Sequence, residues 1–139
     1  MLNDRNIAAT VAVRDLAKAR QFYEETLGLE PIATEGSEAV TYRTGTTSLL
    51  VYRSTFAGTN RATAATWIVG DELDDIAKSL RGKGVRFEHY AFPDAKLEGD
   101  IHVFGDMRNA WFTDPDGNIL SLVNGRPAGT RVAEAPARH

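Results

Sequence analysis

The chain has 139 residues, of which 42% are apolar and 25% are charged. This composition is typical of a globular domain and excludes wholesale disorder and coiled coil. Sixteen basic against nineteen acidic residues give a net charge of -3, so we expect no nucleic-acid and no membrane partner. There is no cysteine, which excludes disulfides, thiolate metal sites and a cysteine nucleophile. The first residues carry charges and no apolar stretch, so we expect a cytoplasmic protein without a signal peptide.

The first half of the chain predicts a strand, a helix and a hairpin. Apolar residues alternate over 7–13, which is typical of a strand. Asp15 is placed to cap a helix that runs to Leu27, and Gly28 suits the left-handed position after its end. Residues 39–43 and 48–52 then predict two strands joined by a turn.

The second half predicts a similar order of elements. The expected elements are a strand at 66–69, a helix capped by Asp71 and ended by Gly84, strands at 85–90, 109–113 and 119–123, a turn at 114–117 and a tail at 125–139. The long connector at 91–106 is predicted to be either a lid or a surface excursion with a local hairpin.

The two halves repeat each other. Asp15 and Asp71 each open a predicted helix, and Gly28 and Gly84 each close one, with the same offset of 56 positions. A constant offset across a cap, a helix and its end predicts two related βαβββ modules, 6–54 and 64–124. We therefore expect one α+β domain over 1–124, with two curved sheets that enclose a cup for a small ligand.

Two motifs resemble those of a known superfamily. Asp15-Leu16, Phe22-Tyr23 and Leu27-Gly28-Leu29 follow one signature of the vicinal oxygen chelate superfamily, and residues 112–118, Phe-Thr-Asp-Pro-Asp-Gly-Asn, follow another. That group includes glyoxalase I, extradiol dioxygenases and the bleomycin and fosfomycin resistance proteins. The resemblance implies a glyoxalase-like fold, and a homodimer because members of this size often pair.

The resemblance also implies four positions for the ligands of a divalent metal. Carried over to this sequence, those positions are Ala8, Leu50, Ala64 and Ser121. Alanine and leucine have no donor atom, and a single serine hydroxyl is a poor ligand for zinc, iron or manganese. We therefore expect no metal cofactor, with a displaced metal as the alternative.

Other residues are candidates for binding or catalysis. As ligand-binding residues we expect Tyr52, Arg53, Trp67, Asp106, Asn109 and Trp111. For the tryptophans and tyrosines, packing in the core is the competing interpretation. His89 and His102 are candidate bases with Glu88 or Asp106 nearby, and these four could also form a relocated metal site.

Two functions follow from these residues. The first is a metal-free protein that binds a small, partly aromatic organic molecule in its cup. The alternative is a lyase, isomerase or dioxygenase-type enzyme that uses a displaced metal or a histidine base. A scaffold without a ligand is a third interpretation.

Overall fold

A computed structural model describes residues 1–125, which form two compact units. The first unit comprises residues 1–65 and 113–120, and the second comprises 66–112 and the chain from residue 121. The tail that the sequence predicts over 125–139 lies, except for its first residue, outside the described residues.

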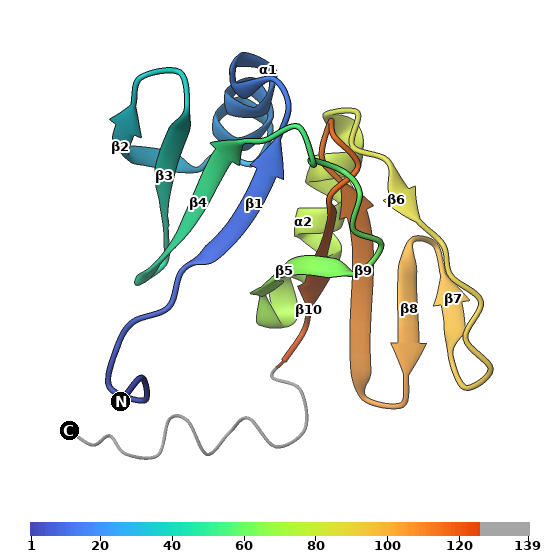
Figure 1. The fold of residues 1–139 in the computed structure, drawn as a ribbon. Coiled ribbons are helices and arrows are strands. Elements are labelled where there is room, and N and C mark those ends of the chain that lie inside the picture. The colour runs from blue at the N-terminus through green and yellow to red at the C-terminus, as the bar shows by residue number, and fades with distance from the viewer. Residues whose placement is uncertain (126–139) are drawn as a thin grey trace. The chain divides into compact units, whose positions relative to one another are not determined.

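The sheet of the first unit has four strands in the order β1-β4-β3-β2 (Figure 1). These strands are β1 (Ala9–Val13), β2 (Glu30–Glu35), β3 (Ala39–Thr44) and β4 (Thr47–Arg53). The pairing of β1 with β4 is parallel, whereas β3 is antiparallel to both of its neighbours. Alternate side chains are buried on one face, as the period of two in a strand requires. These are Val11, Val13, Val40, Tyr42, Leu49 and Val51.

The predicted first helix is confirmed, but its second half is wider than an α-helix. α1 (Leu16–Arg20) continues into a π-helical segment, Gln21–Thr26. Asp15 caps α1 as predicted, because its carboxylate accepts a hydrogen bond from the Lys18 N–H at 3.2 Å. The chain then turns at Gly28, whose φ of 76° lies in the left-handed region.

One boundary and one strand of the first unit differ from the prediction. Ile7 is 90% exposed and precedes β1, so the strand begins two residues later than its apolar pattern suggested. β2 was not predicted, because all six of its residues are exposed and it contains Pro31. A strand at the edge of a sheet tolerates both features.

The predicted turn at 114–117 is confirmed, and several hydrogen bonds hold it in place. The Gly117 N–H donates to the carbonyl of Asp114 at 3.0 Å, which closes the turn. The buried Asp114 carboxylate accepts four further bonds: from the Tyr23 hydroxyl, the Asn118 amide, and the backbone N–H groups of Asp116 and Asn118, all at 2.8–2.9 Å. Burial and the adjacent Asp114 charge raise the pKa of Tyr23, so its hydroxyl remains a donor.

Gly58 of the first unit is a glycine that this turn requires. Its φ is +75°, and a Cβ at this position would overlap the carbonyl oxygen of Asp116. Gly58→Ala therefore combines backbone strain with a clash, and we expect it to lower the free energy of unfolding by about 2–4 kcal/mol. Gly36 has a similar φ of +54° with open space around it. Gly36→Ala should cost only about 1 kcal/mol. Urea denaturation compares the two, and equal losses would contradict the clash.

The second sheet has six strands in the order β5-β10-β9-β8-β7, with β6 also paired to β9 (Figure 1). Their bounds are β5 (Thr63–Ile68), β6 (Phe87–Glu88), β7 (Lys96–Glu98), β8 (Ile101–Phe104), β9 (Met107–Thr113) and β10 (Ile119–Val123). The connector at 91–106 thus contains the hairpin β7–β8, which was one of its two predicted forms. Two mixed sheets with few helices confirm the α+β class.

The helix of the second unit is α2 (Leu73–Gly82), which follows a short 3-10 turn, Gly70–Glu72. Its buried residues are Leu73, Ala77 and Leu80, spaced as in one face of a helix. The prediction that Asp71 caps this helix is wrong, because Asp71 lies inside the 3-10 turn and no side-chain cap is formed. Within residues 1–125, neither α-helix has the length and apolar character needed to cross a bilayer.

Candidate functional site

One face of the hairpin β8–β9 brings three predicted site residues together. His102 on β8 lies directly opposite Asn109 on β9 in the antiparallel ladder. Directly opposed residues project from the same face, and so do residues two apart along a strand. Trp111 therefore shares this face with Asn109, and Phe104 shares it with His102.

Five rings form a cluster on this face, here called the aromatic cluster: Tyr90, Phe92, His102, Phe104 and Trp111. The centre of the His102 ring lies 4.9 Å from that of Trp111 and 5.7 Å from that of Phe92. Phe92 also lies 5.6 Å from Trp111 and 5.2 Å from Phe104, and Tyr90 lies 5.3 Å from Trp111. These separations are those of attractive aromatic pairs.

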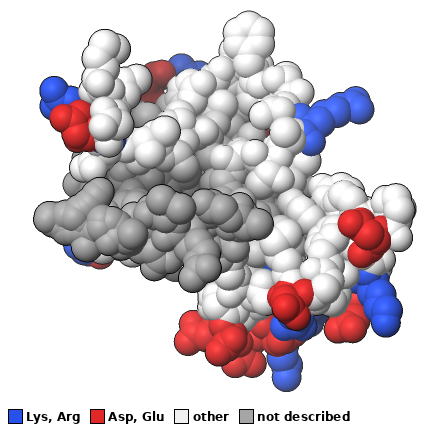
Figure 2. Space-filling model, turned by 90° about the horizontal axis from the view of Figure 1, so that it is seen from below, with Lys and Arg blue, Asp and Glu red and all other residues white. Residues whose placement is uncertain are grey.

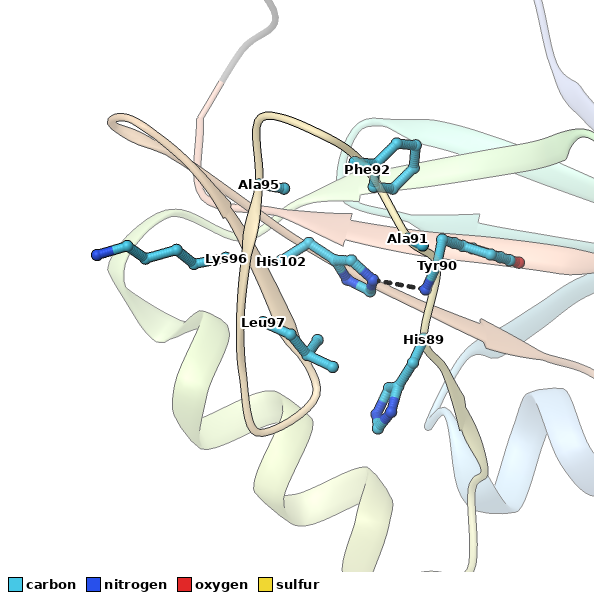
Figure 3. A pocket seen from close by; sticks show the side chains of 8 residues that line it. All are labelled: His89, Tyr90, Ala91, Phe92, Ala95, Lys96, Leu97 and His102. Atoms are coloured by element: carbon cyan, nitrogen blue, oxygen red, sulfur yellow. Dashed lines mark hydrogen bonds between the residues drawn. The ribbon is translucent and has the colours of Figure 1, made fainter.

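A pocket of about 320 Å³ lies beside the aromatic cluster (Figure 3). Its walls come from the segment that follows β6, from β7 and from β8. The lining residues are His89, Tyr90, Ala91, Phe92, Ala95, Lys96, Leu97 and His102. Both histidines that the sequence singled out therefore belong to one pocket.

Only one of the two ring nitrogens of His102 has a hydrogen-bond partner among the described residues. His102 is 1% exposed, and its Nε2 accepts a hydrogen bond of 2.9 Å from the backbone N–H of Tyr90. Nε2 therefore carries no proton, and the proton of the neutral ring is on Nδ1. Nδ1 is buried and has no partner among the described residues, and the same holds for Oδ1 of Asn109. Buried polar atoms without a partner are uncommon and call for an explanation.

His89 is held by a carboxylate. Its Nε2 lies 2.7 Å from Oδ1 of Asp100, while the Nε–H of Arg81 donates to the other oxygen at 2.7 Å. Burial alone would raise the pKa of Asp100, but the hydrogen bonds from His89 and Arg81 outweigh it and hold this pKa below its usual range. The carboxylate beside His89 is thus Asp100, rather than the Glu88 or Asp106 that the sequence suggested.

Because the pKa of Asp100 is lowered, its contribution to the stability of the fold should depend on pH. A carboxyl whose pKa is lower in the folded chain stabilises the fold above its unfolded pKa, near 4, and loses that contribution as the pH falls through its folded value. Arg81→Met removes one of the two hydrogen bonds, so the pKa of Asp100 should rise. A ¹³C NMR titration of the Asp100 carboxyl measures this shift. Arg86→Met, a control at a nearby exposed arginine, should leave the pKa unchanged, and equal shifts would contradict the assignment.

The other predicted binding residues lie elsewhere in their units. Trp67 on β5 stacks on Phe112 with ring centres 6.5 Å apart, and Phe112 is on the opposite face of β9 from Trp111. Tyr52 is 38% exposed and lines a smaller pocket of about 170 Å³ in the first unit. Arg53 forms an exposed ion pair with Glu38 at 3.1 Å. Asp106 is exposed in the turn between β8 and β9, where its carbonyl accepts a bond from Asn124.

Many surface arginines are paired with acids. Arg43, Arg81 and Arg108 contact Glu30, Asp100 and Asp74 at 2.6–2.8 Å. Figure 2 shows acidic and basic side chains interspersed on the described part of one face. This mixed surface therefore does not favour a ligand that binds mainly through a large net charge.

The positions that the resemblance assigns to metal ligands do not fit a divalent cation. Ala8 and Ala64 offer no side-chain donor, and Leu50 is an apolar residue of β4. Ser121 on β10 is buried, and its hydroxyl is engaged with that of Thr66 on β5 at 2.7 Å. Among the described residues, no three His, Asp or Glu side chains converge as a metal site requires, which includes the set Glu88, His89, His102 and Asp106.

Comparison with known families decides the wider relationship. The sequence model of one family, the Glyoxalase/Bleomycin resistance protein/Dioxygenase superfamily, matches residues 7–122 of this chain. The chain belongs to this superfamily. A search of the curated proteins finds no match. Membership of the superfamily gives the fold and does not specify a reaction.

Solved structures of this superfamily share the fold at low sequence identity. Lactoylglutathione lyase from Agrobacterium tumefaciens superposes with a TM-score of 0.69 at 18% identity, over 91% of this chain and 97% of that chain. A mutant of the fosfomycin resistance protein FosX from Listeria monocytogenes, complexed with Mn(II) and 1S,2S-dihydroxypropylphosphonic acid, gives 0.66 at 20% identity, over 91% and 93%. A putative glyoxalase family protein from Bacillus anthracis gives 0.63 at 20% identity, over 91% and 100%.

Several residues of the site were not expected from the sequence. Tyr90, Phe92, Phe104 and Asp100 lie in or beside the connector at 91–106, which has no regular apolar pattern. Their aromatic rings were the available signal, because three Phe or Tyr residues between positions 90 and 104 are many for a surface loop. The position of Asp100 follows from the turn of the hairpin β7–β8, which the sequence did not define.

Proposed function

We propose that this chain binds a small, partly aromatic organic molecule in the pocket beside His102, and that it does so without a metal ion. The observation that carries the proposal is the aromatic cluster next to a pocket that also contains a buried imidazole. Binding sites for small molecules are typically concave, largely apolar and supplied with a few polar groups.

The dimensions of the pocket support a ligand of modest size. A volume of about 320 Å³ lies at the lower end of the range for small-molecule sites, roughly 300–1,000 Å³. Phe92 is 36% exposed at this pocket, so a ligand ring can cover apolar surface that water now contacts. A planar ring stacked there gains both burial and aromatic contact.

The metal-free part of the proposal rests on chemistry at the superfamily's ligand positions. Side chains without donors at Ala8, Leu50 and Ala64, and a Ser121 hydroxyl bonded to Thr66, favour a site that works through shape and hydrogen bonds. The Mn(II) in the FosX complex is a property of that protein. At 20% sequence identity, the similarity between FosX and this chain extends only to the fold.

Tryptophan fluorescence tests the proposal, because the chain has two tryptophans in different environments. In a Trp67→Phe variant the remaining tryptophan is Trp111, which contacts Tyr90, Phe92 and His102 in the aromatic cluster. Titration with a library of one-ring and two-ring compounds should give saturable changes in its emission. The matched Trp111→Phe variant should give little change with the same compounds. A signal confined to Trp67, or saturation with none of the compounds, would contradict binding at this pocket.

A further inference from the structure

The two histidines of the pocket offer opposite hydrogen-bonding groups to a ligand. Their ring centres lie 6.4 Å apart, and both side chains line the pocket (Figure 3). Hydrogen bonds on one nitrogen of each ring determine what the other nitrogen can do. One ring therefore presents an acceptor and the other a donor.

His89 presents the acceptor. Because the Asp100 carboxylate can only accept, the nitrogen that faces it, Nε2, must donate its proton. The neutral ring then has a lone pair on Nδ1, and Asp100 stabilises the positive charge that forms when Nδ1 takes up a proton. Arg81 fixes the other oxygen of Asp100, so the carboxylate is held in place. The half-exposed side chain of His89 remains accessible at the edge of the pocket.

His102 presents the donor. Its Nε2 is occupied by the Tyr90 N–H, so Nδ1–H is the only polar group that the ring can offer. That group is buried without a partner among the described residues, and a ligand oxygen would satisfy it. The His102 ring lines the pocket, so the proposal places that oxygen on the pocket side of the ring.

We propose that the pocket catalyses proton transfer on an aromatic carbonyl compound, with His89 as the base and Asp100 as its positioning residue. This inference rests on the proposed function, since the same pocket must first bind the ring. Nδ1 of His89 removes the proton from the carbon next to the carbonyl. The electron pair of that C–H bond forms the new C=C bond, and the C=O pair moves to oxygen, where Nδ1–H of His102 hydrogen-bonds to the enolate.

The step balances without a co-reactant. The proton on His89 returns either to the enolate oxygen, which gives the enol, or to the same carbon after exchange with water. The net reaction is a keto–enol isomerisation or an exchange of the α-hydrogen. General base catalysis of this kind contributes about 10²–10⁴-fold.

The experiment uses 1-phenylpropan-2-one, which has one ring, one ketone and an acidic CH₂ between them. Loss of its CH₂ signal in D₂O is followed by ¹H NMR, and its binding is measured separately by Trp111 fluorescence. The intact chain should accelerate exchange by at least a hundredfold over an equal concentration of imidazole. His89→Gln should lose that acceleration while its Kd for the ketone stays within twofold.

The positioning role of Asp100 has its own signature. Asp100→Asn should lower kcat for exchange about tenfold with KM unchanged, whereas a merely structural role would change both or destabilise the fold. Glu98→Gln, a control on the same hairpin outside the pocket lining, should leave exchange unaltered. Binding without exchange, or full exchange in His89→Gln, would overturn the catalytic proposal alone. Absence of ketone binding would overturn this inference, and the proposed function falls with it only if none of the one-ring and two-ring compounds binds.

Discussion

Replacement of Asp114 by alanine should lower the free energy of unfolding by about 3 kcal/mol or more, because one buried carboxylate accepts four hydrogen bonds. The loss would leave the hydroxyl of Tyr23, which is fully buried, without its acceptor. One of these bonds, from the Tyr23 hydroxyl, joins the π-helical segment to the turn across 91 positions. Urea denaturation followed by circular dichroism measures the effect.

A double-mutant cycle separates this bond from the rest of the network. Tyr23→Phe alone should cost about 1–2 kcal/mol, and it should cost almost nothing in the Asp114→Ala background. Asp94→Ala, at an exposed acid, serves as the control and should change stability by less than about 0.5 kcal/mol. Additive losses at Tyr23 and Asp114 would mean that the two side chains do not stabilise the fold through each other.

Phe92→Ala should weaken the binding of a one-ring or two-ring ligand about tenfold, because the ligand loses a stacking partner and apolar surface to cover. The side chain is 36% exposed, so the fold should lose much less than after a core truncation. Isothermal titration calorimetry gives the affinity, and thermal unfolding of the free variant gives the stability.

Phe56→Ala is the matched control for this prediction. Phe56 is 76% exposed, belongs to the first unit and does not line the pocket beside His102. Its removal should leave the affinity within twofold. If Phe56→Ala weakened binding as much as Phe92→Ala, the ligand would have to be placed elsewhere.

The elements with strong local signals were predictable from the sequence. The Asp-Pro-Asp-Gly turn and the helix ends at Gly28 and Gly84 depend on backbone geometry that a few residues impose. The strand at 119–123 is a short apolar run, which is typical of a buried strand. β2 depends instead on pairing with β3, and an exposed edge strand with Pro31 has no apolar alternation to reveal it. The π-helical segment likewise leaves no distinct pattern, because its side chains still repeat nearly as in an α-helix.

The site was predictable in part for a related reason. The sequence singled out His102, Asn109 and Trp111, but it left His102 in the connector at 91–106, so their shared face became evident only from the pairing of β8 with β9. The partner of His89 could not be deduced, because Asp100 comes from the hairpin turn and reaches His89 across a distance that only the folded chain defines. Trp67 was equivalent to Trp111 in the sequence, and only the faces of the sheet separate a residue that packs on Phe112 from one in the aromatic cluster.

The affinity of the pocket for a ligand, measured with and without a divalent metal ion, shows whether binding needs a metal. A ligand found by fluorescence is titrated into chelator-treated protein, and again after addition of one equivalent of Zn²⁺, Ni²⁺, Fe²⁺ or Mn²⁺. Because the superfamily's ligand positions hold Ala8, Leu50, Ala64 and Ser121, we predict that Kd stays within twofold throughout. Loss of binding on chelation, with recovery at one metal per chain, would contradict metal-free binding.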